Sequence, residues 1–175
     1  MSEKSLQTEH VVKEKTAKYN NPNFSVEDRV NDLLNRMTLE EKVAQMICIW
    51  GKKKEIIVDE SGNINVDNLA NFYPDGVGQV GRISDTTPTL NAKEMAEFSN
   101  ALQKYFVENT RLGIPAIFHE ECLHGLAGKE ATSYPQPIGL AATFNPELIE
   151  EIYTAIAEDA RSRGAHQALT PVVDV

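Results

Sequence analysis

Two kinds of hydrophobic pattern alternate along the second half of the chain. Short apolar runs bounded by glycine or proline predict strands at residues 77–81, 114–118 and 167–175. Between them, apolar residues recur every three or four positions after two predicted helix caps, Asn91, with Glu94 at the third position, and Asn145, which predicts two helices. Strands that alternate with helices in this way form a parallel sheet with right-handed crossovers. The pattern therefore predicts an α/β fold with about three parallel strands.

The first part of the chain has a more polar character. Residues 1–24 predict a loose N-terminal arm, so we place the domain itself at residues 25–175. Ser25 and Thr38 stand where helix caps are expected, and Thr38 is spaced from Glu41 as in a capping box. Apolar spacing predicts that the two helices turn these residues inward: Val30, Leu33, Leu34 and Met37 in the first, and Leu39, Val43, Met46 and Ile47 in the second.

Residues 52–75 interrupt this order. Two short apolar runs, 55–59 and 63–66, flank Ser61 and Gly62, which is typical of a β-hairpin. The three consecutive lysines at 52–54 indicate a solvated face. We therefore expect residues 52–75 to form an excursion on the surface.

Composition and charge narrow the class of protein. The chain has 175 residues, of which 41% are hydrophobic and 25% charged, the balance of a soluble globular protein. Its formal net charge of -9 makes nucleic acid and anionic membrane surfaces poor partners. No apolar run is long enough to span a membrane, and residues 1–10 lack the apolar segment of a secretory signal, so we expect a cytoplasmic protein. Cys48 and Cys122 form no disulfide framework or metal pattern, and Cys122 is expected to be a small buried hydrophobe.

The densest group of chemically capable residues follows the central predicted strand. His119, Glu120, Glu121 and His124 come directly after the apolar run 114–118. Polar side chains at the carboxyl end of a buried parallel strand are typical of α/β active sites. The alternative is a junction between strand and loop whose polar residues only face water, and the residues alone leave both interpretations open.

Spacing excludes two kinds of site in this group. His119 and His124 are five residues apart, whereas the zinc-protease pattern requires four, so no metal site is predicted. Glu120 and Glu121 are neighbours, and neighbouring side chains of an extended segment point to opposite sides. A retaining glycosidase needs two carboxyl groups about 5–5.5 Å apart across one sugar bond, so these two cannot form the pair. At most one of them faces a substrate.

Several motifs in order resemble one known family. They are Thr38-Leu-Glu-Glu-Lys-Val-Ala-Gln-Met46, Leu112-Gly-Ile-Pro115, Glu121 with His124-Gly125, Pro135-Gln-Pro-Ile-Gly-Leu-Ala141, Asn145-Pro-Glu-Leu148 and Thr170-Pro-Val-Val-Asp-Val175. Together they resemble the N-terminal barrel domain of glycoside hydrolase family 3, which contains β-glucosidases and β-xylosidases. The resemblance covers residues 25–175 apart from the 52–75 excursion, and it implies the N-terminal part of a (β/α)8 TIM barrel.

The resemblance also implies a role for Glu121. Family members usually carry an Asp three residues before the His-Gly pair, and that carboxylate holds sugar hydroxyls. Glu121 stands there in this chain, one methylene longer, which implies a preference for β-xylosides over β-glucosides. His124 and Gly125 are expected to form a packed turn.

The family's nucleophilic Asp and its acid/base Glu lie in later regions, so the resemblance assigns no catalytic residue, cofactor or metal to these 175 residues. We expect the parent to be a retaining, exo-acting β-glycosidase, this stretch to be cut short and inactive alone, and its open sheet edges to favour self-association. The alternative is a non-catalytic carbohydrate-binding or structural domain on the same scaffold.

Overall fold

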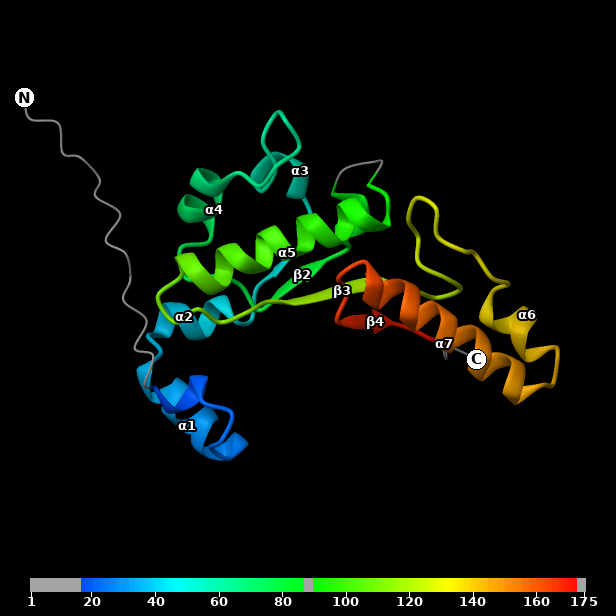
Figure 1. Cartoon of the computed structure of the whole chain (residues 1–175), viewed down its shortest axis with the longest axis horizontal. Coiled ribbons are helices and arrows are strands. Elements are labelled where there is room, and N and C mark those ends of the chain that lie inside the picture. The colour runs from blue at the N-terminus through cyan, green and yellow to red at the C-terminus, as the bar shows by residue number, and fades with distance from the viewer. Residues whose placement is uncertain (1–16, 87–89, 173–175) are drawn as a thin grey trace, which may run out of the picture.

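The computed structural model describes residues 17–86 and 90–172, and its centre is a parallel β-sheet (Figure 1). Four strands lie in the order β1 (Cys48–Ile49), β2 (Gln79–Gly81), β3 (Ile117–Glu121) and β4 (Gln167–Leu169). All three neighbouring pairs are parallel, with Ile49 level with Val80 and Val80 level with Phe118. The α/β class with a parallel sheet is confirmed.

Helices connect the strands and begin where the caps were predicted. The side chains of Ser25, Asn91 and Asn145 each accept a main-chain N–H of the following turn, and Thr38 and Glu41 form the expected capping box. The described helical segments are η1 (Lys18–Asn20), α1 (Val26–Arg36), α2 (Leu39–Ala44), α3 (Lys53–Ile56), α4 (Val66–Phe72), η2 (Ile83–Asp85), α5 (Ala92–Asn109), α6 (Pro137–Ala141) and α7 (Pro146–Ser162).

One face of the sheet packs against helices and forms the core. Ile49, Val80 and Phe118 lie side by side on it and are at most 1% exposed. They form one cluster with Met95, Phe98, Leu102 and Phe106 of α5 and with Ile156 and Ala160 of α7. Helix α5 runs along β2 and β3 in Figure 1.

The opposite face is only partly covered, and it carries exposed and half-buried residues together with the buried His119. Because side chains alternate along a strand, Cys48, Gln79, Ile117, His119 and Glu121 share this side, which we call the open face. Cys48 is exposed and Ile117 is 46% exposed. A parallel sheet is normally covered on both faces, so the open face is the unusual surface of this molecule.

The second helix is shorter than its sequence pattern predicts. Helix α2 ends at Ala44, and the chain then forms β1 at Cys48–Ile49, a strand that the pattern did not predict. Leu39 is 72% exposed and Met46 is 87% exposed, so the predicted inner face of this helix is wrong.

Residues 52–75 are not only a surface excursion, because several of their side chains enter the core. Residues 53–56 form α3 where a strand was predicted, and the expected hairpin is reduced to one antiparallel bridge between Val58 and Ile64. Ile57 and Leu69 are both 0% exposed in the core cluster. The lysine run is not uniformly solvated either, because Lys53 is 4% exposed.

The two later strands also differ from their predicted bounds. Strand β3 covers Ile117–Glu121, three residues later than expected, so His119, Glu120 and Glu121 belong to the strand itself. Strand β4 stops at Leu169 and all three of its residues are exposed, whereas a buried strand was predicted. Residues 173–175 lie outside the described residues.

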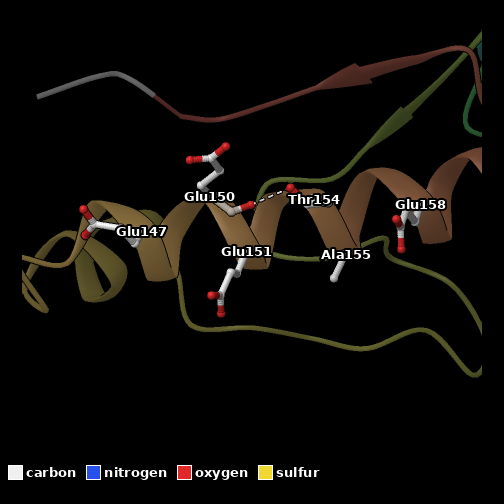
Figure 2. A pocket seen from close by; sticks show the side chains of 6 residues that line it. All are labelled: Glu147, Glu150, Glu151, Thr154, Ala155 and Glu158. Atoms are coloured by element: carbon white, nitrogen blue, oxygen red, sulfur yellow. Dashed lines mark hydrogen bonds between the residues drawn. The ribbon is translucent and has the colours of Figure 1, made fainter.

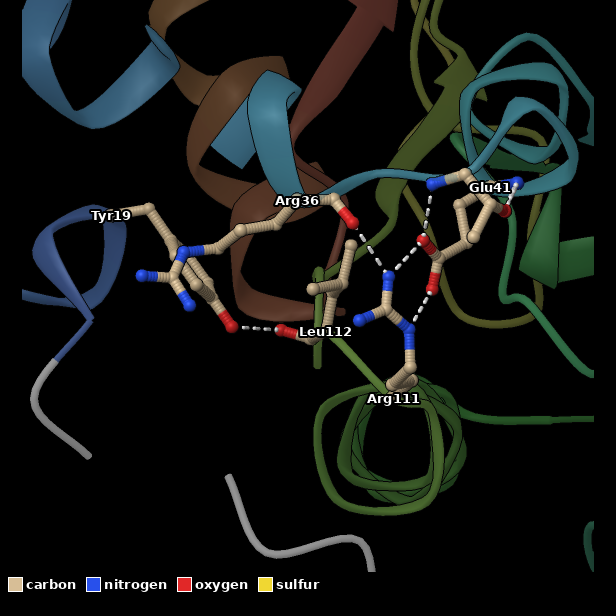
Figure 3. A network of polar contacts seen from close by, with 6 residues as sticks. Tyr19, Arg36, Glu41, Arg111 and Leu112 are labelled. Atoms are coloured by element: carbon tan, nitrogen blue, oxygen red, sulfur yellow. Dashed lines mark hydrogen bonds and ion pairs between the residues drawn. The ribbon is translucent and has the colours of Figure 1, made fainter. Parts of the chain in front are cut away.

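A polar network fastens the first helices to the chain before β3 (Figure 3). Glu41 accepts hydrogen bonds from Arg111, and Arg111 also donates to the main-chain oxygen of Arg36 at 2.8 Å. Tyr19 donates its hydroxyl to the oxygen of Leu112 at 2.9 Å. Of the arm predicted at residues 1–24, residues 1–16 lie outside the described residues, and the boundary at residue 25 stays a prediction.

Candidate functional site

Glu121 ends β3 and lies at the carboxyl edge of the sheet. It is half-buried, it shares the open face with His119, and its register partner on β4 is Leu169. In parallel α/β sheets ligands bind at this edge, because the loops that follow the strands meet there. The strand therefore presents one carboxylate toward the open face.

The neighbouring carboxylate has a structural role. Glu120 is 2% exposed, and its two oxygens accept the main-chain N–H and the hydroxyl of Ser84, each at 2.8 Å. Burial raises the pKa of Glu120, although both bonds from Ser84 oppose that shift. Glu120 thus ties β3 to η2 on the packed side of the sheet, and it does not pair with Glu121 across a substrate.

His119 is buried beneath an aromatic ring. It is 5% exposed, and the centroids of its ring and the Trp50 ring are 5.4 Å apart at an angle of 34°. Both rings lie over Gly81, where an added Cβ would come within 2.4 Å of Trp50 and 2.6 Å of His119. Burial and the charge of Lys53 lower the pKa of His119, and Glu121 opposes this, so the imidazole is neutral at neutral pH.

Lys53 holds the end of β1 in place. Its ammonium group pairs with Asp85 of η2 at 2.7 Å and donates a hydrogen bond to the main-chain oxygen of Trp50. The same group lies 5.9 Å from the centroid of the Trp50 ring. Trp50 is therefore fixed by Lys53 and His119, yet it remains 42% exposed.

The loop after β3 is packed tightly at its start. Gly125 has a φ of 111°, and an added Cβ would lie 2.2 Å from the main-chain oxygen of Thr132. The main-chain oxygen of His124 accepts the N–H of Tyr134 at 2.7 Å. His124 and Gly125 thus form the packed turn that the sequence predicts.

The only cysteine in this loop is inert. Cys122 is 0% exposed, and burial together with the charges of Glu120 and Asp159 raises the pKa of its thiol to about 11. A thiol in this state is protonated at neutral pH and is a poor nucleophile or metal ligand. Cys122 is the small buried hydrophobe that the sequence predicts.

Two surface hollows of the described residues were compared as places where a ligand could bind. A hollow of about 600 Å³ adjoins the loop after β3 and is lined by Leu123, His124, Gln136, Pro137, Ile138, Ala141 and Val172. A second, of about 430 Å³, lies along α7, where Figure 2 shows Glu147, Glu150, Glu151 and Glu158 on a single helix. The hydroxyl of Thr154 donates to the main-chain oxygen of Glu150 within the same helix. The side chains of the second hollow belong to one solvated helix face, whereas the first hollow adjoins the loop that directly follows Glu121, so we place the candidate site at the carboxyl end of β3.

Other functions fit the described residues less well. Within residues 17–86 and 90–172, no three His, Cys, Asp or Glu side chains gather as a metal site would require. Among the helices described, none is both long and apolar enough to cross a membrane. Sequence reasoning proposed Glu121 but did not point to Trp50 or Lys53, because the positions of these two residues depend on the pairing of β1 with a strand about 30 residues later.

Comparison with known proteins identifies the family. The glycosyl hydrolase family 3 N terminal domain matches residues 38–175. A protein of Formosa agariphila, provisionally named a β-xylosidase, is 35% identical over 158 residues, which cover 90% of this chain and 20% of that protein. Beta-glucosidase C of Emericella nidulans is 33% identical over 165 residues, covering 90% of this chain and 26% of the relative.

Solved structures agree with this assignment. A β-glucosidase from Erythrobacter marinus superposes with a TM-score of 0.74 at 31% identity, covering 91% of this chain and 20% of that one. An exo-1,3/1,4-β-glucanase from a Pseudoalteromonas species gives a TM-score of 0.68 at 25% identity, covering 85% of this chain and 18% of that one. The chain thus spans about a fifth of the length of the Formosa agariphila relative and about a quarter of that of the Emericella nidulans relative. Because the family domain matches most of its residues, the chain belongs to glycosyl hydrolase family 3.

Proposed function

We propose that this chain provides the sugar-holding part of a retaining, exo-acting β-glycosidase that hydrolyses β-xylosides or β-glucosides. The observation that supports this most is the position of Glu121, half-buried at the carboxyl edge of the sheet and on its open face. An ionised carboxylate accepts strong hydrogen bonds from two sugar hydroxyls and fixes the ring for attack. The relatives named β-glucosidase or β-xylosidase support the substrate class.

The central test is binding. Isothermal titration calorimetry with methyl β-D-xylopyranoside should show binding to the 175-residue chain, and Glu121→Gln should weaken it at least about tenfold, because a neutral amide makes a weaker hydrogen bond. Glu97→Gln on α5 is the matched control, since Glu97 is exposed and pairs with the exposed Lys93 of the same helix. Equal affinities for the wild type and Glu121→Gln would refute the role of Glu121.

Hydrolysis by the chain alone is not part of this proposal. A retaining mechanism needs a nucleophilic carboxylate and an acid/base carboxyl about 5–5.5 Å apart. Glu120 cannot be the partner of Glu121, because it faces the other side of β3 and is bound to Ser84. We therefore expect no turnover of nitrophenyl β-glycosides by the 175-residue chain, and turnover that Glu121→Ala abolishes would contradict us.

We also propose that the site prefers β-xylosides to β-glucosides. The side chain of Glu121 is one methylene longer than an aspartate, so its carboxylate reaches into the space that a hexose hydroxymethyl group would fill. The chain should then bind methyl β-D-xylopyranoside more tightly than methyl β-D-glucopyranoside, and Glu121→Asp should reduce the difference. A clear preference of the wild type for the glucoside would exclude this explanation.

The alternative of a carbohydrate-binding domain without catalysis shares the same contact with sugar. Reading the coding sequence after residue 175 separates the two, because an Arg-rich segment followed by a catalytic Asp supports the glycosidase. Cytoplasmic location also stays a prediction, and two relatives are named periplasmic. Fractionation of the source cells tests it.

A further inference from the structure

We infer that Trp50 is a second sugar-contacting residue, an aromatic platform on which the ring of a β-linked pyranoside packs while Glu121 holds its hydroxyls. This inference rests on the proposed function of Glu121 and adds a contact that the family resemblance does not assign. It follows from where the Trp50 ring lies, how it is held and how much of it is exposed.

Strand register places Trp50 beside the candidate site. Ile49 is level with Val80 and Phe118, and the ring of Trp50, the next residue, lies over Gly81 and against His119. Glu121 lies two residues farther along β3 on the same face, which is about 6–7 Å at the rise of a strand. The ring and the carboxylate are therefore at successive levels of one surface.

The Trp50 ring leans across β2 toward β3. Strands β1 and β3 are separated by two strand spacings, about 9–10 Å. The rings of Trp50 and His119 nevertheless have centroids only 5.4 Å apart. Gly81 permits this approach, because a Cβ there would come within 2.4 Å of the indole. The missing side chain of Gly81 lets the indole reach the neighbourhood of Glu121.

The ring is both fixed and accessible. Lys53, only 3% exposed at its side chain, is bonded to the main-chain oxygen of Trp50 and paired with Asp85. His119 packs against the ring and is buried, whereas Trp50 itself is 42% exposed. A large aromatic side chain held in one place with an exposed surface loses little conformational freedom when a ligand packs on it.

The indole of Trp50 and the carboxylate of Glu121 together match the chemistry of a β-linked pyranoside. The negative face of an aromatic ring attracts the slightly positive C–H groups of an apolar surface. A β-linked pyranoside with equatorial hydroxyls presents such C–H groups on each face of its ring and hydroxyls around its rim. A carboxylate next to an indole therefore fits a β-xyloside or β-glucoside.

Two measurements on the 175-residue chain test the inference directly. Trp50 is the only tryptophan, so intrinsic tryptophan fluorescence reports this ring alone. Methyl β-D-xylopyranoside should change the emission with the same midpoint that calorimetry gives. In saturation-transfer difference NMR, the hydrogens of one sugar face (H1, H3 and axial H5, or H2 and H4) should be saturated more strongly than those of the other. Binding without any emission change, or with equal saturation of both faces, would overturn the inference.

Variants separate this inference from the proposed role of Glu121. Trp50→Ala should weaken xyloside binding about tenfold. Trp50→Phe keeps an aromatic face, so it should retain binding within about threefold and guards against misfolding of the alanine variant. Phe72→Ala is the matched control, because Phe72 is 60% exposed and lies on α4.

The binding results for Glu121→Gln and Trp50→Ala together distinguish failure of the Trp50 platform from failure of the proposed role of Glu121. Loss of binding in Glu121→Gln with full binding in Trp50→Ala would overturn the platform and leave the proposed function intact. Loss in Trp50→Ala with full binding in Glu121→Gln would overturn the role of Glu121 and support the platform. No xyloside binding by the wild-type chain would overturn both.

Discussion

Arg111 is the residue whose replacement tests the fold most sharply. Its guanidinium donates to Glu41 through Nε at 2.8 Å and through Nη2, and Nη2 also donates to the oxygen of Arg36 at 2.8 Å (Figure 3). Glu41 also accepts the main-chain N–H of Thr38 at 2.9 Å. One side chain before β3 therefore joins the end of α1 to the start of α2, and Arg111→Met removes that connection.

The size of the effect follows from the burial of the two partners. Removing one member of a fully buried ion pair costs about 3–5 kcal/mol, whereas an exposed pair contributes about 0–1 kcal/mol. The side chain of Glu41 is 5% exposed and that of Arg111 is 50% exposed, so solvent screens one side of the pair. We expect Arg111→Met to lower the free energy of unfolding by about 2 kcal/mol. For a chain of this length, that lowers the Tm by about 4–8 °C.

The pH dependence of this loss has a definite sign. Burial alone would raise the pKa of Glu41, but the hydrogen bond and charge of Arg111 and the N–H of Thr38 together lower it below its ordinary value. A carboxyl whose pKa is lower in the folded state stabilises the fold above its unfolded pKa, and this contribution disappears as the pH falls through the folded pKa. The difference between Arg111→Met and wild type should therefore be full at pH 7 and shrink below about pH 4.5.

Thermal unfolding followed by circular dichroism at neutral and acidic pH measures both the loss of unfolding free energy in Arg111→Met and the dependence of that loss on pH. Lys93→Met is the matched control, because Lys93 pairs with Glu97 at 3.6 Å with both side chains exposed, and it should change stability by less than about 0.5 kcal/mol. If Arg111→Met behaved like this control, or were equally destabilising at both pH values, the reasoning about the pair would be refuted.

Three further predictions concern separate features of the chain. In the native protein one thiol, Cys48, should be accessible to a thiol reagent, with Cys122 reacting only after unfolding, and two reactive thiols in the native protein would contradict the burial of Cys122. Gly125→Ala should lower the free energy of unfolding by about 1–3 kcal/mol or more, because Gly125 has a φ of 111°. Gly51→Ala should have little effect in the same unfolding measurement, since an added Cβ there meets nothing within 4 Å, and equal losses would contradict the strain. The chain should self-associate through its open sheet edges, β1 and β4, in sedimentation experiments, and a monomer at every concentration would refute this.

Features set by nearby residues were predictable from the sequence. Asn91 and Glu94 cap α5 as expected, since both partners of a capping box lie within one turn. The apolar stripe of α5 is buried as predicted, because an 18-residue helix repeats its pattern several times. The packed turn at Gly125 was also predictable, because the residues it contacts, Thr132 and Tyr134, follow within about ten positions along the chain.

Features set by distant residues were not predictable. Strand β1 has two residues, too few for any periodicity, and it exists because it pairs with β2. Ile57 is β-branched and suggested a strand, but packing in the core overrides that preference. Lys53 is buried because Asp85, 32 residues later, neutralises it. Glu121 could be proposed from the sequence because it belongs to a local motif. Trp50 could not, because only the pairing of distant strands in the folded sheet places it beside β3.

The most direct test of the proposed sugar contact is a crystal structure of the 175-residue chain with methyl β-D-xylopyranoside. We predict sugar hydroxyls within about 2.5–3.0 Å of the Glu121 carboxylate, with the pyranose ring above Trp50 on the open face. A sugar bound elsewhere, or a Glu121 side chain turned away from the bound sugar, would contradict the account.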